Sequence, residues 1–180
     1  MNICSYSNKF NDIINQLQLN NQKQIIKWQI LNSRNIQNLI LNYIYFTPQT
    51  KEELKKAVDI WCIDKKEAKK KYGDINTWDV HNITDMSNLF ADYYYFNDNI
   101  NNWDVSNVKN MEYMFLDCYK FNQPLNNWDV SNVFNMNDMF YSCTKFNQSL
   151  NNWNVSNSTF INGMFFHCNS LLSEPNWYNP

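Results

Sequence analysis

The chain has 180 residues, of which 44% are hydrophobic and 18% are charged, and its formal net charge is −2. Only 2 Gly and 4 Pro occur, which excludes a collagen-like or linker protein, and the charged fraction is too low for a charge-rich disordered chain. Five Cys are too few for a disulfide scaffold.

The N-terminal twenty residues contain no apolar core region and no small-residue cleavage site of the kind found in export signals. The most apolar stretch, residues 36–46, is about half as long as a membrane-spanning helix. We therefore predict neither an export signal nor a membrane span. This favours an intracellular over a surface location, without fixing the compartment.

Charge is divided unevenly along the chain. Residues 1–73 carry 12 Lys/Arg and 6 Asp/Glu, a balance of +6, whereas residues 74–180 carry 3 Lys and 11 Asp/Glu, a balance of −8. Contacts to phosphate groups require Lys and Arg, so the second part is not expected to bind nucleic acid.

The first predicted element is a helical segment over residues 1–46. Its apolar residues recur at helical spacing in two stretches: Phe10, Ile13, Ile14 and Leu17, then Ile36, Leu39, Ile40, Tyr43 and Ile44. Pro48 follows and ends the region. No motif in this segment indicates its role.

Residues 50–73 are predicted to form a helical N-terminal cap. Thr50 and Glu53 have the spacing of a capping box, and Asp64 with Glu67 marks a second helix start. Gly73 is placed to end the second helix. Such a helix pair would cover the first unit of the repeat that follows.

Residues 74–180 contain a repeat. Trp78, Trp103, Trp128 and Trp153 are each 25 residues apart, and Trp177 follows at 24. The second unit reads WDVSNVKNMEYMFLDCYKFNQPLNN and the third reads WDVSNVFNMNDMFYSCTKFNQSLNN. A fixed period of this length indicates stacked structural units that contact only their neighbours.

The spacing of apolar residues within a unit predicts a short strand and then a helical return. In the third unit Trp128 and Val130 alternate with Asp129, as in a strand, and from Val133 to Phe140 the spacing changes to three. This plan and period are those of leucine-rich repeats. We therefore predict an α+β repeat: a leucine-rich-repeat-like solenoid of about four 25-residue coils over residues 74–180.

The string FNQPLNNWDVSNVFNMNDMF resembles the BspA-like leucine-rich-repeat surface proteins, a family with a 25–26-residue bacterial surface-protein repeat. The segment that precedes the repeat resembles the entry region of the same family, so the resemblance covers residues 51–177. It implies a leucine-rich-repeat-like fold that is associated with surfaces and binds other molecules rather than catalysing a reaction.

Repeated columns of residues are expected to form the core. Fifteen positions should stack inward from unit to unit: Trp78, Trp103, Trp128, Trp153, Val80, Val105, Val130, Val155, Phe90, Phe115, Phe140, Phe165, Phe96, Phe121 and Phe146. The Asn column at positions 82, 107, 132 and 157 suits a turn with side-chain-to-backbone hydrogen bonds, with recognition by exposed amides as the alternative.

Cys118, Cys143 and Cys168 form a further column. Buried free thiols are the favoured interpretation, and zinc binding or disulfides between units are the alternatives.

The exposed positions of the predicted strand are the candidate binding face. They are Asp79, Asp104, Asp129, His81, Ser106 and Ser131, continued in the fourth unit by Asn154 and Ser156. Solvated or hydrogen-bonded side chains are the favoured interpretation of the Asp column, and a bridging cation is the alternative.

Catalytic motifs are not found. The two His residues have no nucleophile at a recognisable spacing, and two Gly cannot form a phosphate-binding loop. We predict no enzyme, cofactor or metal, but a protein-protein interaction or scaffold module whose partner is a protein. The alternatives are a structural protein that self-associates through an open C-terminal coil and an exported adhesin-like surface protein.

Overall fold

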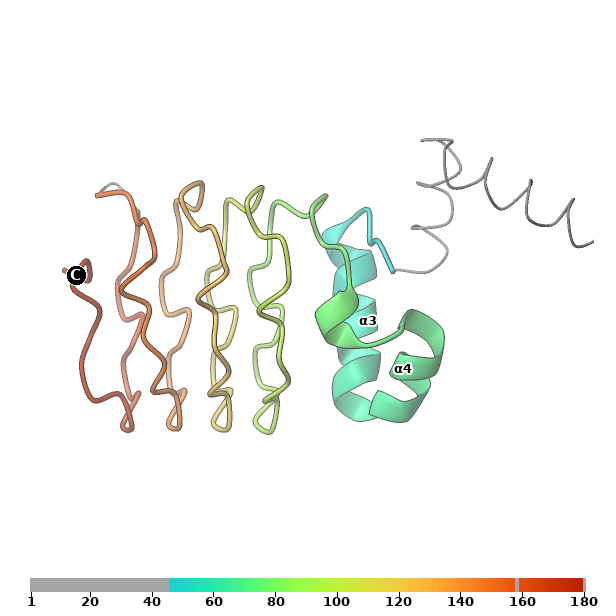
Figure 1. The fold of residues 1–180 in the computed structure, drawn as a ribbon. Coiled ribbons are helices and arrows are strands. Elements are labelled where there is room, and N and C mark those ends of the chain that lie inside the picture. Colours follow the sequence, from blue (N-terminus) through green and yellow to red (C-terminus); the bar gives the residue numbers. More distant parts are fainter. Residues whose placement is uncertain (1–45, 158, 180) are drawn as a thin grey trace, which may run out of the picture. The chain divides into compact units, whose positions relative to one another are not determined.

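The computed structural model describes residues 46–157 and 159–179. Its elements are the α-helices α3 (Lys51–Ile63) and α4 (Lys65–Tyr72) and the 3₁₀ helix η1 (Ile75–Thr77). The repeat units follow as coils that lie side by side (Figure 1), here numbered coil 1 (78–102), coil 2 (103–127), coil 3 (128–152) and coil 4 (153–177). The helical segment predicted for residues 1–46 lies outside the described residues, apart from Phe46.

Both predicted helix starts and the predicted helix end are confirmed. The Thr50 hydroxyl accepts a hydrogen bond from the Glu53 N–H at 3.2 Å, and the Asp64 carboxylate accepts one from the Glu67 N–H at 3.0 Å. Asp64 thus ends α3 and begins α4, and Gly73, with φ at 76°, ends α4. Side chains therefore satisfy N–H groups that the first turn of each helix leaves unpaired.

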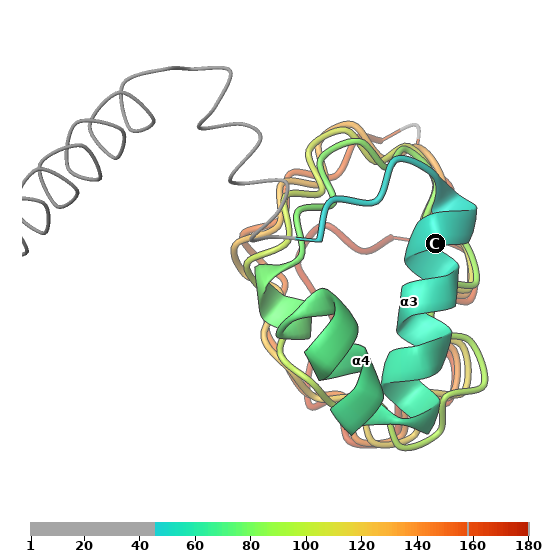
Figure 2. The same ribbon diagram turned by 90° about the vertical axis from the view of Figure 1, so that its right-hand side faces the viewer.

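Helices α3 and α4 lie across coil 1 (Figure 2). The buried side chains of α3 are Leu54, Ala57, Val58 and Trp61. The Trp61 ring meets the Trp78 ring edge-on at 5.7 Å, and Tyr72, at the end of α4, meets it at 5.9 Å. The helix pair therefore removes Trp78, the first Trp of the repeat, from water.

No helix in the described residues is long and apolar enough to cross a membrane.

The predicted α+β class and leucine-rich-repeat-like solenoid are wrong. The described residues contain no strand, only isolated parallel bridges that join Asp85 to Asn110, Asn110 to Asn135 and Asn135 to Phe160. The same residues contain no helix after η1, so the coils consist of turns and irregular backbone.

The predicted strand is absent because an Asp side chain turns the chain. In coil 3 the Asp129 carboxylate accepts a hydrogen bond from the Ser131 N–H at 3.0 Å, and the Val133 N–H donates to the Val130 carbonyl at 3.0 Å. The alternation of Trp128, Asp129 and Val130 is thus followed at once by a turn that starts on Asp129. The extended part is too short to pair as a strand.

The predicted helical return is absent because left-handed residues interrupt it. In coil 3, Asp138 has φ at 53° and Ser142 has φ at 59°, and the corresponding positions of the other coils are also left-handed. Alternate N–H groups point to the next coil instead. Those of Met136, Asp138, Phe140 and Ser142 donate to the carbonyls of Phe160, Asn162, Met164 and Phe166 at 2.7 to 3.0 Å. The three-residue spacing therefore marks successive turns, not a helix.

The predicted core columns are confirmed. All fifteen positions are buried except Val155, which is half-buried. The Trp78 and Trp103 rings stack at 6.2 Å, and the rings of Phe90, Phe115 and Phe140 follow one another at 5.4 Å with interplanar angles of 3° and 5°. Aromatic stacking therefore runs through the interior of the coils.

Polar columns tie each coil to the preceding one. The Asn107 and Asn132 amides donate to the carbonyls of His81 and Ser106 at 2.9 and 2.8 Å, as the structural interpretation of this column predicts. The thiols of Cys118, Cys143 and Cys168 donate to carbonyls 28 residues earlier at 3.0 to 3.1 Å. All four described Cys are free, so these thiols act as buried hydrogen-bond donors.

We expect Gly163→Ala to lower the free energy of unfolding by about 1–2 kcal/mol, because an L-residue pays this cost in the left-handed region. Gly163 has φ at 65°, and an added Cβ would lie 2.1 Å from the Asp138 carboxylate. Gly163→Val should cost more, since β-branched residues tolerate this region least. Urea denaturation measures both, with Ser173→Ala as the exposed control. Equal stability of all three variants would contradict the left-handed backbone.

Candidate functional site: a tyrosine-lined pocket

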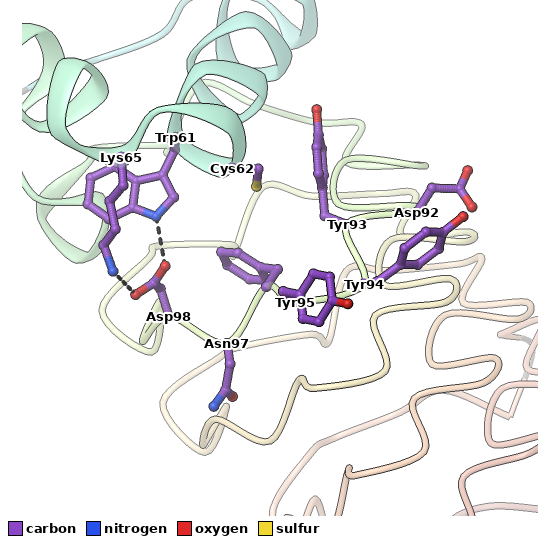
Figure 3. A pocket seen from close by; sticks show the side chains of 10 residues that line it. Trp61, Cys62, Lys65, Asp92, Tyr93, Tyr94, Tyr95, Asn97 and Asp98 are labelled. Carbon is purple, nitrogen blue, oxygen red and sulfur yellow. Dashed lines mark hydrogen bonds and ion pairs between the residues drawn. The ribbon is translucent and has the colours of Figure 1, made fainter.

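A cavity of about 460 Å³ lies where the end of α3 and the start of α4 face coil 1 (Figure 3). This size falls within the range of protein ligand pockets. Its lining residues are Trp61, Cys62, Lys65, Asp92, Tyr93, Tyr94, Tyr95, Phe96, Asn97 and Asp98. Local sequence builds both walls, because Trp61, Cys62 and Lys65 lie close together in sequence at the helix junction and residues 92–98 form one continuous segment of coil 1.

One wall joins a tryptophan, a lysine and a carboxylate. The Trp61 indole N–H donates to one oxygen of Asp98 at 2.8 Å, and the Lys65 ammonium pairs with the other oxygen. The same ammonium lies 5.2 Å from the centre of the Trp61 ring. The charge of Asp98 is therefore balanced by Lys65, and both side chains are fixed in place.

A second group of the same composition stands behind the opposite wall. The Tyr93 hydroxyl donates to Asp59 at 2.7 Å, Lys55 pairs with the same carboxylate, and the Lys55 ammonium lies 4.8 Å from the centre of the Tyr93 ring. Burial and then the Asp59 carboxylate raise the pKa of Tyr93. Tyr93 therefore stays a neutral hydrogen-bond donor at neutral pH.

The rim of the pocket carries exposed tyrosines. Tyr95 is 83% exposed and Tyr94 is 44% exposed. Tyr94 stacks on Tyr119 of coil 2, with ring centres 5.0 Å apart and an interplanar angle of 7°. These rings offer flat apolar faces with polar hydroxyl edges, a combination that is enriched at protein interfaces.

The pocket thiol is not activated. Burial raises the pKa of Cys62 to about 12. The positive charge of nearby Lys55 lowers this pKa, but by less than burial raises it. A nucleophilic cysteine needs a lowered pKa and an electropositive setting, so Cys62 has the opposite environment. No His lines the pocket, and within residues 46–157 and 159–179 no group of three His, Cys, Asp or Glu side chains is placed to hold a metal ion.

We expect the described thiols to resist alkylation in the folded protein at pH 8. Burial raises the pKa of Cys62 and of Cys168 to about 12 each, and it also raises the pKa of Cys118 and Cys143 well above the ordinary value of a thiol. At pH 8 the thiolate fraction at a pKa of 12 is about 10⁻⁴, against roughly a quarter for an ordinary thiol, so raising the pH should speed the reaction.

Iodoacetamide labelling followed by mass spectrometry measures this. A Cys4→Ser variant leaves only the four described thiols, and urea-unfolded protein is the control. Folded and unfolded chains labelling at similar rates would show that the thiols are not buried.

The residues of the predicted binding face lie at a turn, with the hydrogen-bonded carboxylates that the favoured interpretation expects. The six residues are Asp79, Asp104, Asp129, His81, Ser106 and Ser131. In coils 1, 2 and 3 the Asp carboxylate accepts a hydrogen bond from the N–H of the residue two positions on, at 3.0 to 3.4 Å. They therefore lie pairwise at one turn of successive coils, not along strands. Whether this turn binds a partner stays a prediction.

The pocket residues are absent from the candidates that sequence reasoning selected. The signal for them is a departure from the repeat: coil 1 reads YYYF at positions 93–96, where coils 2 and 3 read CYKF and CTKF. Stacking of the repeat does not require these three consecutive tyrosines, because the other coils lack them. Their position next to the predicted cap therefore indicates a function specific to coil 1.

Comparison with known proteins identifies a family but no activity. No curated protein and no solved structure matches this chain. The family model described as "Mycoplasma protein of unknown function, DUF285" matches residues 61–177, which include all four coils and the pocket. The match covers more than half of the chain, and the chain therefore belongs to the DUF285 family.

Proposed function

We propose that this chain is a non-catalytic protein-binding module and that the tyrosine-lined pocket is its binding site. The observation that supports this is the placement of Tyr94, Tyr95 and Tyr119, exposed on a backbone that the coil stack and α3 hold in place. Rigid aromatic side chains lose little conformational freedom on binding and supply large contact areas.

The chemistry of the pocket also favours binding over catalysis. Cys62 is protonated at neutral pH, and Lys65 and Asp98 neutralise each other. None of these groups is poised to take up or deliver a proton at pH 7. A nucleic acid is a poor fit, because coil 1 has four Asp and neither Lys nor Arg. The proposed partner is therefore a protein.

Site-specific crosslinking tests the proposal in the cells that make the protein. The full chain carries p-benzoylphenylalanine at position 95 or, as the control, at position 152, which is exposed on coil 3. We expect a discrete adduct from position 95 only, and we expect Tyr94→Ser with Tyr119→Ser to reduce its yield. No adduct from position 95, or equal adducts from both positions, would overturn the proposal.

Self-association through the last coil is not part of this proposal. In coils 1 to 3, every second N–H group of the segment equivalent to residues 136–142 donates a hydrogen bond to a carbonyl of the next coil. The equivalent N–H groups of coil 4 belong to Ile161, Gly163 and His167, and they have no acceptor among the described residues. Two such edges facing each other would set donors against donors. Light scattering should therefore give a mass that does not change with protein concentration.

The exported adhesin predicted as an alternative has no support in the geometry of the pocket. We do not propose it.

A further inference from the structure

Two groups at the helical end of the molecule follow one pattern. In each, an aromatic side chain donates a hydrogen bond to an Asp, and a lysine pairs with that Asp while its ammonium lies over the aromatic ring. The groups are Trp61–Asp98–Lys65 and Tyr93–Asp59–Lys55. The molecule thus shows twice how an aromatic ring and a carboxylate together hold a cation.

A third group has the aromatic ring and the carboxylate but lacks the lysine. Tyr94 and Tyr119 stack at the rim of the pocket, and Asp92 and Asp117 occupy equivalent left-handed positions, two residues before each Tyr. Figure 3 shows Asp92 and Tyr94 at the same end of the pocket. Neither carboxylate forms an ion pair within the described residues. Lys120, three residues after Asp117, forms no ion pair within these residues either.

The electrostatic surroundings agree with this arrangement. Desolvation and then the Asp117 carboxylate raise the pKa of Tyr119, and Asp92 adds to the effect. Asp98 is neutralised by Lys65 and Cys62 is uncharged, so the charge that the pocket presents comes from Asp92 and its neighbour Asp117.

We propose that Tyr94, Tyr119, Asp92 and Asp117 form a seat for a lysine or arginine side chain of a partner polypeptide. The cation lies over the exposed tyrosine faces and pairs with the carboxylates, as Lys55 and Lys65 do in the two complete groups. This inference rests on the proposed function and names the chemistry of the partner. Arginine fits best, because its planar group stacks on aromatic faces and pairs with carboxylates through two hydrogen bonds.

A labelled peptide of six Arg-Gly repeats tests the inference by fluorescence anisotropy with the full chain. A peptide of six Gln-Gly repeats is the matched probe, and we expect at least tenfold weaker binding for it. Asp92→Asn with Asp117→Asn should weaken binding of the Arg peptide at least tenfold. Asn tolerates the left-handed conformation of both positions, so the fold is retained.

Two further variants separate a specific seat from general attraction to an acidic protein. Tyr94→Leu with Tyr119→Leu keeps every charge and should weaken binding at least threefold, whereas Asp129→Asn, which keeps the turn-forming hydrogen bond on coil 3, should leave it unchanged. Equal loss from Asp129→Asn, or no loss from the tyrosine variant, would overturn the seat.

The remaining outcomes also decide between explanations. Tighter binding of spermidine than of the Arg peptide would identify a free polyamine as the occupant and overturn the inference. If crosslinking at position 95 succeeds but the Arg and Gln peptides bind equally, the binding module stands and the cation seat is wrong. If neither crosslinking nor the Arg peptide shows binding, both proposals fall.

Discussion

Phe115→Ala is expected to lower the free energy of unfolding by about 3–5 kcal/mol, the range for truncating a fully buried aromatic side chain. Phe115 is 0% exposed and stacks between Phe90 and Phe140 at 5.4 Å on each side. The cavity would open in the middle of the stack, where no side chain is free to fill it. Urea denaturation followed by tryptophan fluorescence measures the loss.

The matched control is Phe134→Ala, because Phe134 belongs to the adjacent coil but is 54% exposed. It should change the free energy of unfolding by no more than about 0.5 kcal/mol. Similar losses from the two variants would mean that the Phe column does not carry the core. A change in the denaturant slope would show that coils unfold separately, as stacked repeats can do.

Trp103→Phe should destabilise the protein more than Trp78→Phe, by at least about 2 kcal/mol. The Trp103 indole N–H donates to the Ile75 carbonyl at 2.7 Å, and those of Trp128 and Trp153 donate to the equivalent carbonyls of the preceding coils. The Trp78 indole N–H is buried and has no hydrogen-bond partner among the residues that the structure describes. Phe therefore removes a hydrogen bond at one position and an unpaired buried donor at the other.

Both variants lose nearly the same apolar volume, so the packing cost cancels in the comparison. The two Trp side chains are each 2% exposed, which makes them a matched pair. Thermal and urea denaturation of both proteins gives the difference directly. Equal destabilisation would show that the Trp78 N–H is satisfied in solution.

The Trp78 indole N–H is unpaired among the described residues because the helix α3, and not another coil, covers this side of coil 1. The indoles of Trp103, Trp128 and Trp153 each reach a carbonyl 28 residues earlier. The carbonyl 28 residues before Trp78 belongs to Thr50, and it already accepts a hydrogen bond from the Leu54 N–H at the start of α3. Trp78 is surrounded instead by the edges of the Phe46, Trp61 and Tyr72 rings. The helical cap thus excludes water from coil 1 without continuing its hydrogen bonds.

The pocket shows the limit of reasoning from the repeat. Asp79, Asp104 and Asp129 form a conspicuous acidic column, yet each carboxylate is engaged in its own turn. Tyr93, Tyr95 and Asp98 have no counterpart of the same type in the other coils, and they become a site only where α3 faces them. Lys65 and Asp98 are 33 residues apart in sequence, and no local sequence pattern predicts that they form an ion pair.

The sequence alone determined the period, the inward columns and the helix ends. Each depends on local spacing: a 25-residue repeat that buries the same side chains in every coil, and side chains that cap the N–H groups within three residues. The backbone between the columns was decided only in the tertiary structure. A three-residue spacing of apolar residues fits a helix and a series of turns equally well. The turns form here because the N–H groups of Met136 and Phe140 donate to carbonyls of the next coil. These hydrogen bonds can form only when the coils have stacked, so the spacing within one coil does not predict them.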